Sequence, residues 1–250
     1  MRTFDTLVSE ALAADVAGWD FSWLDGRATE ERPPWGYAQL LAQRLSTASA
    51  ALDIDTGGGE VIAEAPLLPP RMAATEAHPP NVARARKRLG PRRVDVVESG
   101  PEKLPFANGS FDLVSSRHPV RPVWSEIARV LVPGGTYFAQ HVGPASAFEL
   151  IEFFLGPQPA NRRSRHTDTE VHDAEAAGLA LETLRTARCR MEFRDIGAVI
   201  WILRKCPWWV PDFSVDGYLP QLRELDARLR RGESFVAHST RHLIVARTPD

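Results

Sequence analysis

The sequence predicts a doubly wound α/β fold built on a mostly parallel, seven-stranded sheet. The apolar run 51–54 meets three consecutive glycines, Gly57 to Gly59, and a helix-forming segment follows at Glu60, which is typical of a strand, a tight turn and a helix. Strand-like and helix-like segments then alternate along the chain, as in parallel sheets covered by helices. With 250 residues, 44% of them hydrophobic and 25% charged, the chain is long enough for one globular core with additions.

Composition argues against several classes of protein and leaves a nucleic-acid partner unsupported. The net charge of −2 provides no general attraction to nucleic acid or lipid headgroups. Cys189 and Cys206 lack metal-ligand spacing, so we expect no metal site and a reducing cytoplasm. The longest apolar run, 196–203, is too short to span a bilayer, and the first residues lack an apolar signal segment. We therefore expect a soluble cytoplasmic protein, monomeric or homodimeric, with no membrane partner.

Residues 1–48 are predicted to form an N-terminal helical cap. Leu7, Val8, Ala11 and Leu12 recur at helical spacing, and 37–45 is a second amphipathic helix. Aromatic residues are dense between these helices, and Trp35 and Tyr37 end that stretch. These rings either pack the cap onto the body or offer an aromatic face to a cationic ligand.

The elements after the glycine turn follow the order of a doubly wound sheet. Residues 71–76 read as a second strand that ends in Glu76, about twenty residues past the turn, where such sites place a carboxylate for ribose hydroxyls. Pro79 and Pro80 open a helix that Gly90 closes. The later strands and the helix between them are predicted at 93–98, 111–115, 124–131 (helix) and 136–142.

Several motifs in this region occur in one fixed order. Asp53, Asp55, Gly57 and Gly59 overlie the pattern D/E-x-G-x-G-x-G, with Asp55 at a position that is usually glycine. Glu-x-Leu-Pro-Phe follows at 102–106, Asn-Gly-Ser-Phe-Asp-Leu-Val at 108–114 and a segment ending in Pro-Gly-Gly at 126–135. Over residues 50–145 the chain resembles the class I S-adenosylmethionine (SAM) dependent methyltransferases of the type 11 group.

The resemblance implies a Rossmann-like methyltransferase fold with an antiparallel C-terminal edge strand, SAM as cofactor and S-adenosylhomocysteine as product. The residues it implies for the cofactor are Asp53, Asp55, Thr56, Gly57, Gly58, Gly59, Glu76, Ala77, Gly100, Pro101, Glu102 and Ser116. Asp55 would either approach the amino group of the methionine moiety or crowd the pocket. Gly100 stands where the family often has an adenine-binding Asp, so that contact would pass to loop backbone, Glu98 or Glu102.

The loop after the fourth strand is the candidate for acceptor chemistry, because it lies at the carboxyl edge of the sheet. His118 is the candidate general base, since the usual histidine pKa suits proton removal at neutral pH, and Arg117 could orient an acidic substrate. His118 could equally support the backbone or contact the cofactor, and many methyltransferases need no base. His141 ends the fifth strand near the same edge and is a candidate substrate contact.

The C-terminal third is predicted to complete the sheet and to cover the pocket. A helix at 147–155, a polar loop, a helix from 169 and a strand within 180–193 precede the final strand at 235–246. A helix pair inserted between these strands would form a lid. Its aromatic residues Trp201, Trp208 and Trp209 indicate a small or medium organic acceptor with an apolar part, although core packing would also explain them.

The expected segments are the cap 1–48, a SAM-binding core 49–194, lid helices 195–232 and a final core strand 233–250. The expected activity is methyl transfer from SAM to an oxygen, nitrogen or carbon nucleophile of a small molecule. The alternatives are a non-catalytic SAM-binding protein, an RNA base methyltransferase and an NAD(P)-dependent oxidoreductase. The last lacks the third glycine of its fingerprint, because Ile62 occupies that position.

Overall fold

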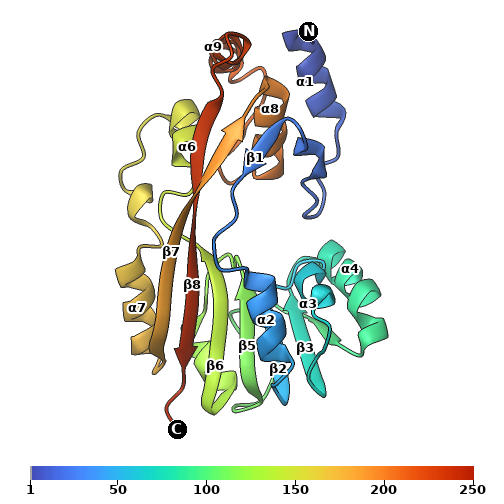
Figure 1. Cartoon of the computed structure of the whole chain (residues 1–250), viewed down its shortest axis with the longest axis vertical. Coiled ribbons are helices and arrows are strands. Elements are labelled where there is room, and N and C mark those ends of the chain that lie inside the picture. Colours follow the sequence, from blue (N-terminus) through green and yellow to red (C-terminus); the bar gives the residue numbers. More distant parts are fainter. Residues whose placement is uncertain (1) are drawn as a thin grey trace. The chain divides into compact units, whose positions relative to one another are not determined.

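The computed structural model describes residues 2–250, which divide into two compact units (Figure 1). The sheet unit comprises residues 33–143, 165–187 and 241–250. The helical unit comprises residues 2–32, 144–164 and 188–240. The long strands β7 (Ala180–Phe193) and β8 (Phe235–Arg247) each begin in one unit and end in the other.

The sheet unit is built on five parallel strands in the order β6-β5-β2-β3-β4. Their bounds are β2 (Ala50–Ile54), β3 (Arg71–Glu76), β4 (Asp95–Glu98), β5 (Phe111–Arg117) and β6 (Leu131–Val142). Strand β8 pairs antiparallel with β6, and β7 lies beyond β8. The doubly wound, mostly parallel sheet with an antiparallel C-terminal strand, predicted from the sequence, is thus confirmed.

Helices cover both faces of this sheet, because successive strand residues point to opposite sides. Ala51 packs on one side with α2 (Tyr37–Leu45), α3 (Glu60–Glu64) and α4 (Pro79–Leu89). Its neighbour Leu52 packs on the other side with α5 (Trp124–Val130) and α7 (Thr167–Ala176). The near-continuous apolar strands follow from this burial on both faces.

The register of the sheet decides which polar residues meet at its carboxyl edge. Asp53 lies opposite Ser115, and Ile54 lies opposite Ser116, in the pairing of β2 with β5. Glu76 lies opposite Glu98 at the end of β3 and β4. The strand ends predicted to hold a ligand are therefore neighbours in space.

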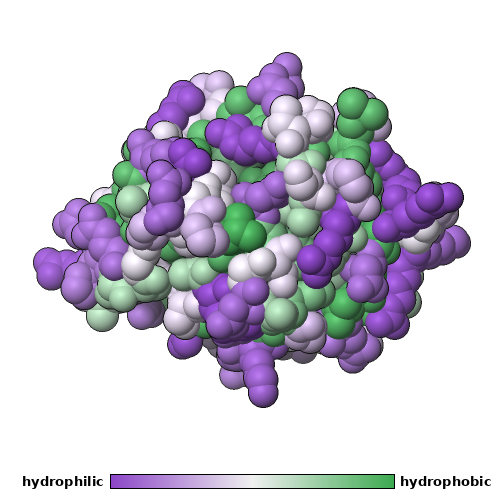
Figure 2. Space-filling view, turned by 90° about the horizontal axis from the view of Figure 1, so that it is seen from below, coloured by the Kyte–Doolittle hydropathy of each residue, from purple (hydrophilic) through white to green (hydrophobic). Residues whose placement is uncertain are grey.

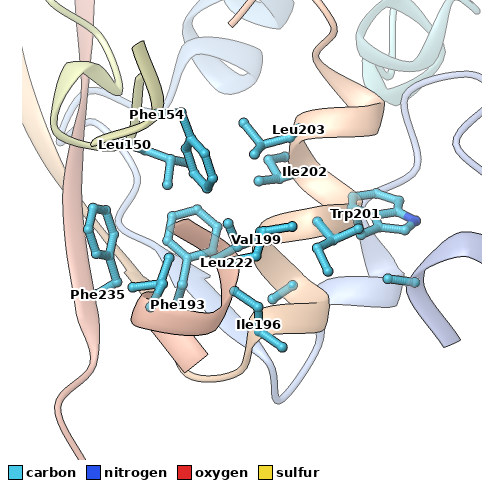
Figure 3. Packing of buried hydrophobic residues seen from close by; sticks show 14 of the residues in the cluster. Leu150, Phe154, Phe193, Ile196, Val199, Trp201, Ile202, Leu203, Leu222 and Phe235 are labelled. Atoms are coloured by element: carbon cyan, nitrogen blue, oxygen red, sulfur yellow. The ribbon is translucent and has the colours of Figure 1, made fainter. Parts of the chain in front are cut away.

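The helical unit has its own apolar core. Helices α1 (Phe4–Ala13), α6 (Phe148–Leu155), α8 (Ile196–Lys205) and α9 (Leu219–Arg230) surround it together with β1 (Ala28–Glu30). Figure 3 shows Phe154 and Leu150 facing Leu203 and Ile202, with Phe193 between the helices. Nearly every residue of α8 is buried, so α8 is the central helix of this unit.

The structure differs from the predicted segments in two respects. Strand β1, which lies in the predicted helical cap, pairs antiparallel with β7 from Ala28 to Glu30, so the described residues form eight strands instead of seven. Helix α2 belongs to the sheet unit, whereas α1 packs with α8 in the helical unit. The reason is the apolar face of α2, where Tyr37, Leu41 and Leu45 are buried against the sheet.

The surface mixes polar and apolar residues. Figure 2, seen from below the view of Figure 1, shows separate hydrophobic areas between hydrophilic ones. Within residues 2–250, no helix has both the length and the apolar character needed to cross a membrane.

We expect Gly59→Ala to destabilise the protein more than the same change at Gly178. Both glycines have left-handed φ angles, of 78° and 84°, so an added Cβ strains the backbone at each. At Gly59 the new Cβ would also lie 2.7 Å from Leu89 Cδ1, whereas at Gly178 it would meet nothing within 4 Å. Urea denaturation should show losses of about 2–4 kcal/mol at Gly59 and about 1–2 kcal/mol at Gly178. Equal losses would contradict the predicted contact with Leu89.

Candidate active site at the carboxyl ends of the strands

The glycine turn after β2 is built from three left-handed residues. Asp55, Gly57 and Gly59 have φ angles of 55°, 62° and 78°. Glycine adopts this conformation freely. At Asp55 the left-handed backbone costs about 1–2 kcal/mol, although Asp tolerates this conformation better than most other residues do. The turn therefore brings backbone close to whatever lies above β2, and it places one carboxylate there.

Two arginines hold this turn and the short helix α3 that follows it. Arg88, on α4, donates to the carbonyl of Gly58. Arg92 donates to the carbonyls of Ile62 and Ala63 at 3.1 and 3.0 Å. The Ala63 carbonyl lies in the last turn of α3, where a helix runs out of its own N–H donors, so Arg92 supplies a donor there.

Glu76 connects the end of β3 to the glycine turn. Its Oε2 accepts a hydrogen bond from the Gly57 N–H and its Oε1 one from the His78 N–H, both at 2.8 Å. The side chain is buried, and each carboxylate oxygen keeps a lone pair for a further donor. Ala77 follows at the exposed end of the strand, and Thr56 donates its N–H to the carbonyl of Thr75.

Asp53 is buried within β2. Its Oδ1 accepts a hydrogen bond of 2.6 Å from the Ser115 hydroxyl, which the pairing of β2 with β5 places opposite it. Burial raises the pKa of Asp53 to about 6, against the opposing effect of the Ser115 bond. Burying the ionised Asp53 carboxylate therefore costs free energy, and the group lies at the carboxyl edge of the sheet where a ligand is expected.

Asp55 is the most unusual group of the site. The Val120 N–H donates to its carboxylate, and Oδ2 is buried with no hydrogen-bond partner in the part of the chain that the structure describes. Burial, followed by the nearby Glu76 and Glu102, raises the pKa of Asp55 to about 6. A buried carboxylate oxygen without a partner is costly, so it indicates a donor supplied by a ligand.

The loop after β4 also lies at the carboxyl ends of the strands, next to Glu76 and the glycine turn. An added Cβ at Gly100 would meet the Glu102 carboxylate at 2.6 Å, and Glu102 itself is exposed. Glu126 accepts from the Leu104 N–H at 2.7 Å, and Arg129 donates to the carbonyls of Leu104 and Phe106 at 3.0 and 2.7 Å. Helix α5 therefore fixes the position of this loop.

The loop after β5 holds His118 in a hydrogen-bonded chain. Trp35 Nε1 donates to Gln140 Oε1 at 2.7 Å, so the Gln140 amide nitrogen faces His118 Nε2 at 2.8 Å. Gln140 can only donate there, which leaves the ring proton on His118 Nδ1. Burial, followed by Arg241 and Arg117, holds the pKa of His118 well below its usual value. The lone pair that a general base needs is thus already used.

The aromatic residues predicted near the ligand pack on the strand ends. Tyr37 stacks on Phe138 at 5.0 Å, and its hydroxyl donates to the Ser116 carbonyl at 3.1 Å. Trp35 is buried beside it and carries the bond to Gln140. Arg117 ends β5 opposite Gln140 and is exposed. The three predicted residues Trp35, Tyr37 and Arg117 thus share one edge of the sheet unit.

A small cavity of about 10 Å³ lies at the ends of β2 and β5, and it has roughly the size of one water molecule. The residues that line it are Ile54, Pro101, Ser116, Pro119, Arg121, Pro122, Val123, Ile127 and Tyr137. Proline and aliphatic side chains make most of its wall. Ser116 and Tyr137 are the lining residues whose side chains carry a hydroxyl group.

Tyr137 belongs to a buried chain of hydrogen-bonded side chains that the sequence did not predict. Tyr137 Oη lies 2.9 Å from His141 Nε2, and His141 Nδ1 lies 2.8 Å from Glu170 Oε2. Tyr137 and His141 are four residues apart on β6 and so share a face, which the strand period could have indicated. Nothing in the sequence pairs Glu170, on α7, with that face.

The predicted tryptophans of the lid belong to the helical unit. Trp201 is buried in its core, where Trp23 stacks on it at 5.6 Å and its Nε1 donates to the Asp15 carbonyl. Trp208 is 60% exposed, and Trp209 is half-buried against the same core. These three tryptophans therefore belong to a different unit from the strand-end residues.

In the described part of the chain, residues 2–250, no group of three or more His, Cys, Asp or Glu could hold a metal ion. The strand ends instead gather Asp53, Asp55, Glu76 and Glu102, whose charges act on one another. This arrangement suits a ligand that carries positive charge and hydroxyl groups.

We expect the pH dependence of stability to reveal Asp53. A raised native pKa means that the folded protein holds its proton more tightly than the unfolded chain, so a stability penalty develops as the pH rises from about 4 to about 6. The penalty is fully present above that range and amounts to at most about 3 kcal/mol. Relative to wild type, Asp53→Asn should therefore gain stability between pH 4 and pH 7 in urea denaturation.

Asp95→Asn, at an exposed position of β4, is the matched control and should show a nearly constant difference from wild type. A constant difference for Asp53→Asn as well would contradict the raised pKa.

Residues 52–139 match the family model described as a methyltransferase domain. No curated protein matches the chain. Among solved structures, the chain is similar to the YcgJ protein of Bacillus subtilis, with 18% identity, coverage of 86% of this chain and 98% of that chain, and a TM-score of 0.63.

Two further structures are similar. One is an S-adenosylmethionine dependent methyltransferase from Mesorhizobium loti, with 17% identity, coverage of 85% and 98%, and a TM-score of 0.50. The other is phosphoethanolamine N-methyltransferase 2 of Haemonchus contortus in complex with S-adenosyl-L-methionine, with 16% identity, coverage of 86% and 53%, and a TM-score of 0.51. At these identities the likeness shows the fold.

Proposed function

Because residues 52–139 are a class I methyltransferase domain, we propose that the protein binds SAM at the carboxyl ends of β2, β3 and β4 and methylates a small or medium organic molecule. SAM would supply an activated methyl group on a sulfonium, and S-adenosylhomocysteine would leave. The acceptor atom would be oxygen, nitrogen or carbon. The observation that carries the proposal is the Glu76 carboxylate, which is held at the glycine turn with lone pairs left for ribose hydroxyls.

The residues present fit this ligand. SAM has two positive groups, an ammonium and a sulfonium, and the unpartnered Oδ2 of Asp55 together with Asp53 offers negative charge to them. Gly57, with a left-handed φ, lets backbone approach the ligand closely. The Gly100 to Glu102 loop would hold adenine. The remaining wall of the SAM site would be formed by Thr56, Gly58, Ala77 and Ser116.

On the acceptor side, we assign a binding role to Arg117 and His118. His118 Nε2 is engaged by Gln140 and its Nδ1 carries a proton, so His118 would donate a hydrogen bond to an acceptor and would not remove its proton. Arg117, exposed at the end of β5, would attract an acidic group on the acceptor.

A second candidate function is SAM binding without turnover. Asp55 in place of a glycine is the observation that favours it, because its carboxylate occupies the turn. Binding and transfer measured on the same protein separate the two functions.

Calorimetric titration should show SAM binding to wild-type protein and no binding of NADH. We expect Glu76→Gln to weaken SAM binding by about tenfold or more, because a carboxylate that accepts hydrogen bonds from ribose is lost. Glu64→Gln, at an exposed position of α3, is the control and should bind as wild type does. Binding of NADH instead of SAM would contradict the proposal.

We expect Asp55→Asn to reduce the preference for SAM over S-adenosylhomocysteine. Only SAM carries the sulfonium charge, and a neutral amide attracts it less than a carboxylate does. The affinity for SAM should fall several-fold, whereas that for the product should change less. Both dissociation constants are measured by calorimetry at pH 8, where Asp55 is ionised. A parallel loss of both affinities would show that Asp55 acts on the shared ammonium or on the turn alone.

A further inference from the structure

The buried chain of Tyr137, His141 and Glu170 has the order of a proton relay. The three side chains come from β6 and α7 of the sheet unit, and their exposed fractions are 0%, 2% and 6%. Both links are short, at 2.9 Å for Tyr137 Oη to His141 Nε2 and 2.8 Å for His141 Nδ1 to Glu170 Oε2. Water is thus excluded from both hydrogen bonds.

The chemistry of the partners determines where the protons lie. Glu170 Oε2 is the acceptor that faces His141 Nδ1, so Nδ1 carries the ring proton and Nε2 keeps a lone pair. Tyr137 therefore donates to Nε2. The Tyr137 oxygen can still accept a hydrogen bond, and Tyr137 is one of the residues that line the small cavity.

The surroundings hold this chain in place. The Trp124 ring contacts Tyr137 at 5.5 Å and His141 at 5.8 Å. Burial raises the pKa of Tyr137, with an opposing bond from Ser116, so the phenol keeps its proton in the resting protein. The other titratable and charged groups that act on the chain include Tyr37, Asp53, Asp55, His118, Arg165 and His242.

Resting on the methyltransferase function, we propose that Tyr137, His141 and Glu170 take the proton from an acceptor whose O–H or N–H group is methylated. As the acceptor's lone pair forms the new bond to the methyl carbon, the carbon–sulfur bond breaks and its electron pair stays on sulfur. The acceptor's proton passes to Tyr137 Oη, and the phenol proton passes to His141 Nε2. Glu170 stabilises the resulting imidazolium, and the proton later leaves to solvent.

Tyr137 is the catalytic residue of this relay, because its oxygen meets the acceptor at the cavity. His141 and Glu170 are positioning residues that act through it. The cavity has the size of one water molecule. It can hold the reacting hydroxyl or amino group of the acceptor, but not the rest of the acceptor molecule. The proposal thus narrows the acceptor to alcohols, phenols and amines.

The test compares Tyr137→Phe, His141→Asn and Glu170→Gln with wild type. Matched controls outside the chain are Tyr218→Phe in the helical unit and His172→Asn and Glu175→Gln at exposed positions of α7. SAM affinity by calorimetry should be the same in all seven proteins. Circular dichroism confirms that each variant folds.

The activity readout uses radiolabelled SAM with phenol and with 4-nitrophenol, which is already ionised near neutral pH. Tyr137→Phe should lower the transfer rate to phenol by about 100-fold or more and change the rate to 4-nitrophenol little. The solvent deuterium isotope effect seen with phenol should disappear in the same variant. The three control variants should keep both rates.

A second readout needs no cofactor. Nitrogen–proton correlation spectra of histidine-labelled protein should show the His141 proton on Nδ1, and Glu170→Gln should shift that resonance, whereas Glu175→Gln should not. A proton on Nε2 would overturn the relay.

The outcomes separate the two proposals. Wild-type protein that fails to bind SAM would refute the methyltransferase function and the relay with it. Wild-type protein that binds SAM but methylates no alcohol, phenol or amine, the two phenols included, would overturn the relay and leave SAM binding in place. Equal losses with phenol and 4-nitrophenol in Tyr137→Phe would also overturn it, since they would indicate a purely structural role.

Discussion

The hydrogen bonds from the Gly57 and His78 N–H groups to Glu76 are the interaction on which the strand-end site depends. They tie the end of β3 to the turn after β2, so two elements distant in sequence are held as one surface. A buried carboxylate would be costly without these donors. The left-handed conformation of Gly57 makes its N–H available, and the register of the parallel strands sets the distance. The turn and the acid therefore form one structure, and neither would keep its position alone.

The same edge concentrates unfavourable charge. Asp53 and Asp55 both have pKa values raised to about 6, chiefly by burial, and Asp55 also carries backbone strain. A fold selected only for stability would place amides or apolar side chains there. The cost is offset by the two layers of helices, whose apolar contacts with the sheet are extensive. Stability supplied by the body of the sheet unit thus permits a strained, acidic edge suited to a cation.

The sequence predicts those parts of the site that local chemistry defines. The glycine turn and Glu76 could be read from strand and turn signals, because each lies next to the end of its own strand. Eight strands formed instead of seven because β1, only three residues long, depends on pairing with β7 rather than on its own pattern. Gln140, which orients His118, and Glu170, which orients His141, act through contacts between elements. Their roles follow from register and packing, which one sequence does not display.

The two histidines of the edge show how such contacts decide function. His118 lies in the loop where sequence reasoning expects a base, yet an amide donor occupies its Nε2 and the nearby arginines oppose its protonation. His141 lies within a strand, where a core role is the simpler expectation, yet a carboxylate holds its Nδ1 proton and leaves Nε2 facing a phenol. A base needs a lone pair that faces a transferable proton, and a partner that stabilises its cation. Of these two histidines, His141 has both, because its Nε2 faces the Tyr137 hydroxyl and its Nδ1 faces Glu170, whereas the His118 Nε2 faces an amide that keeps its proton.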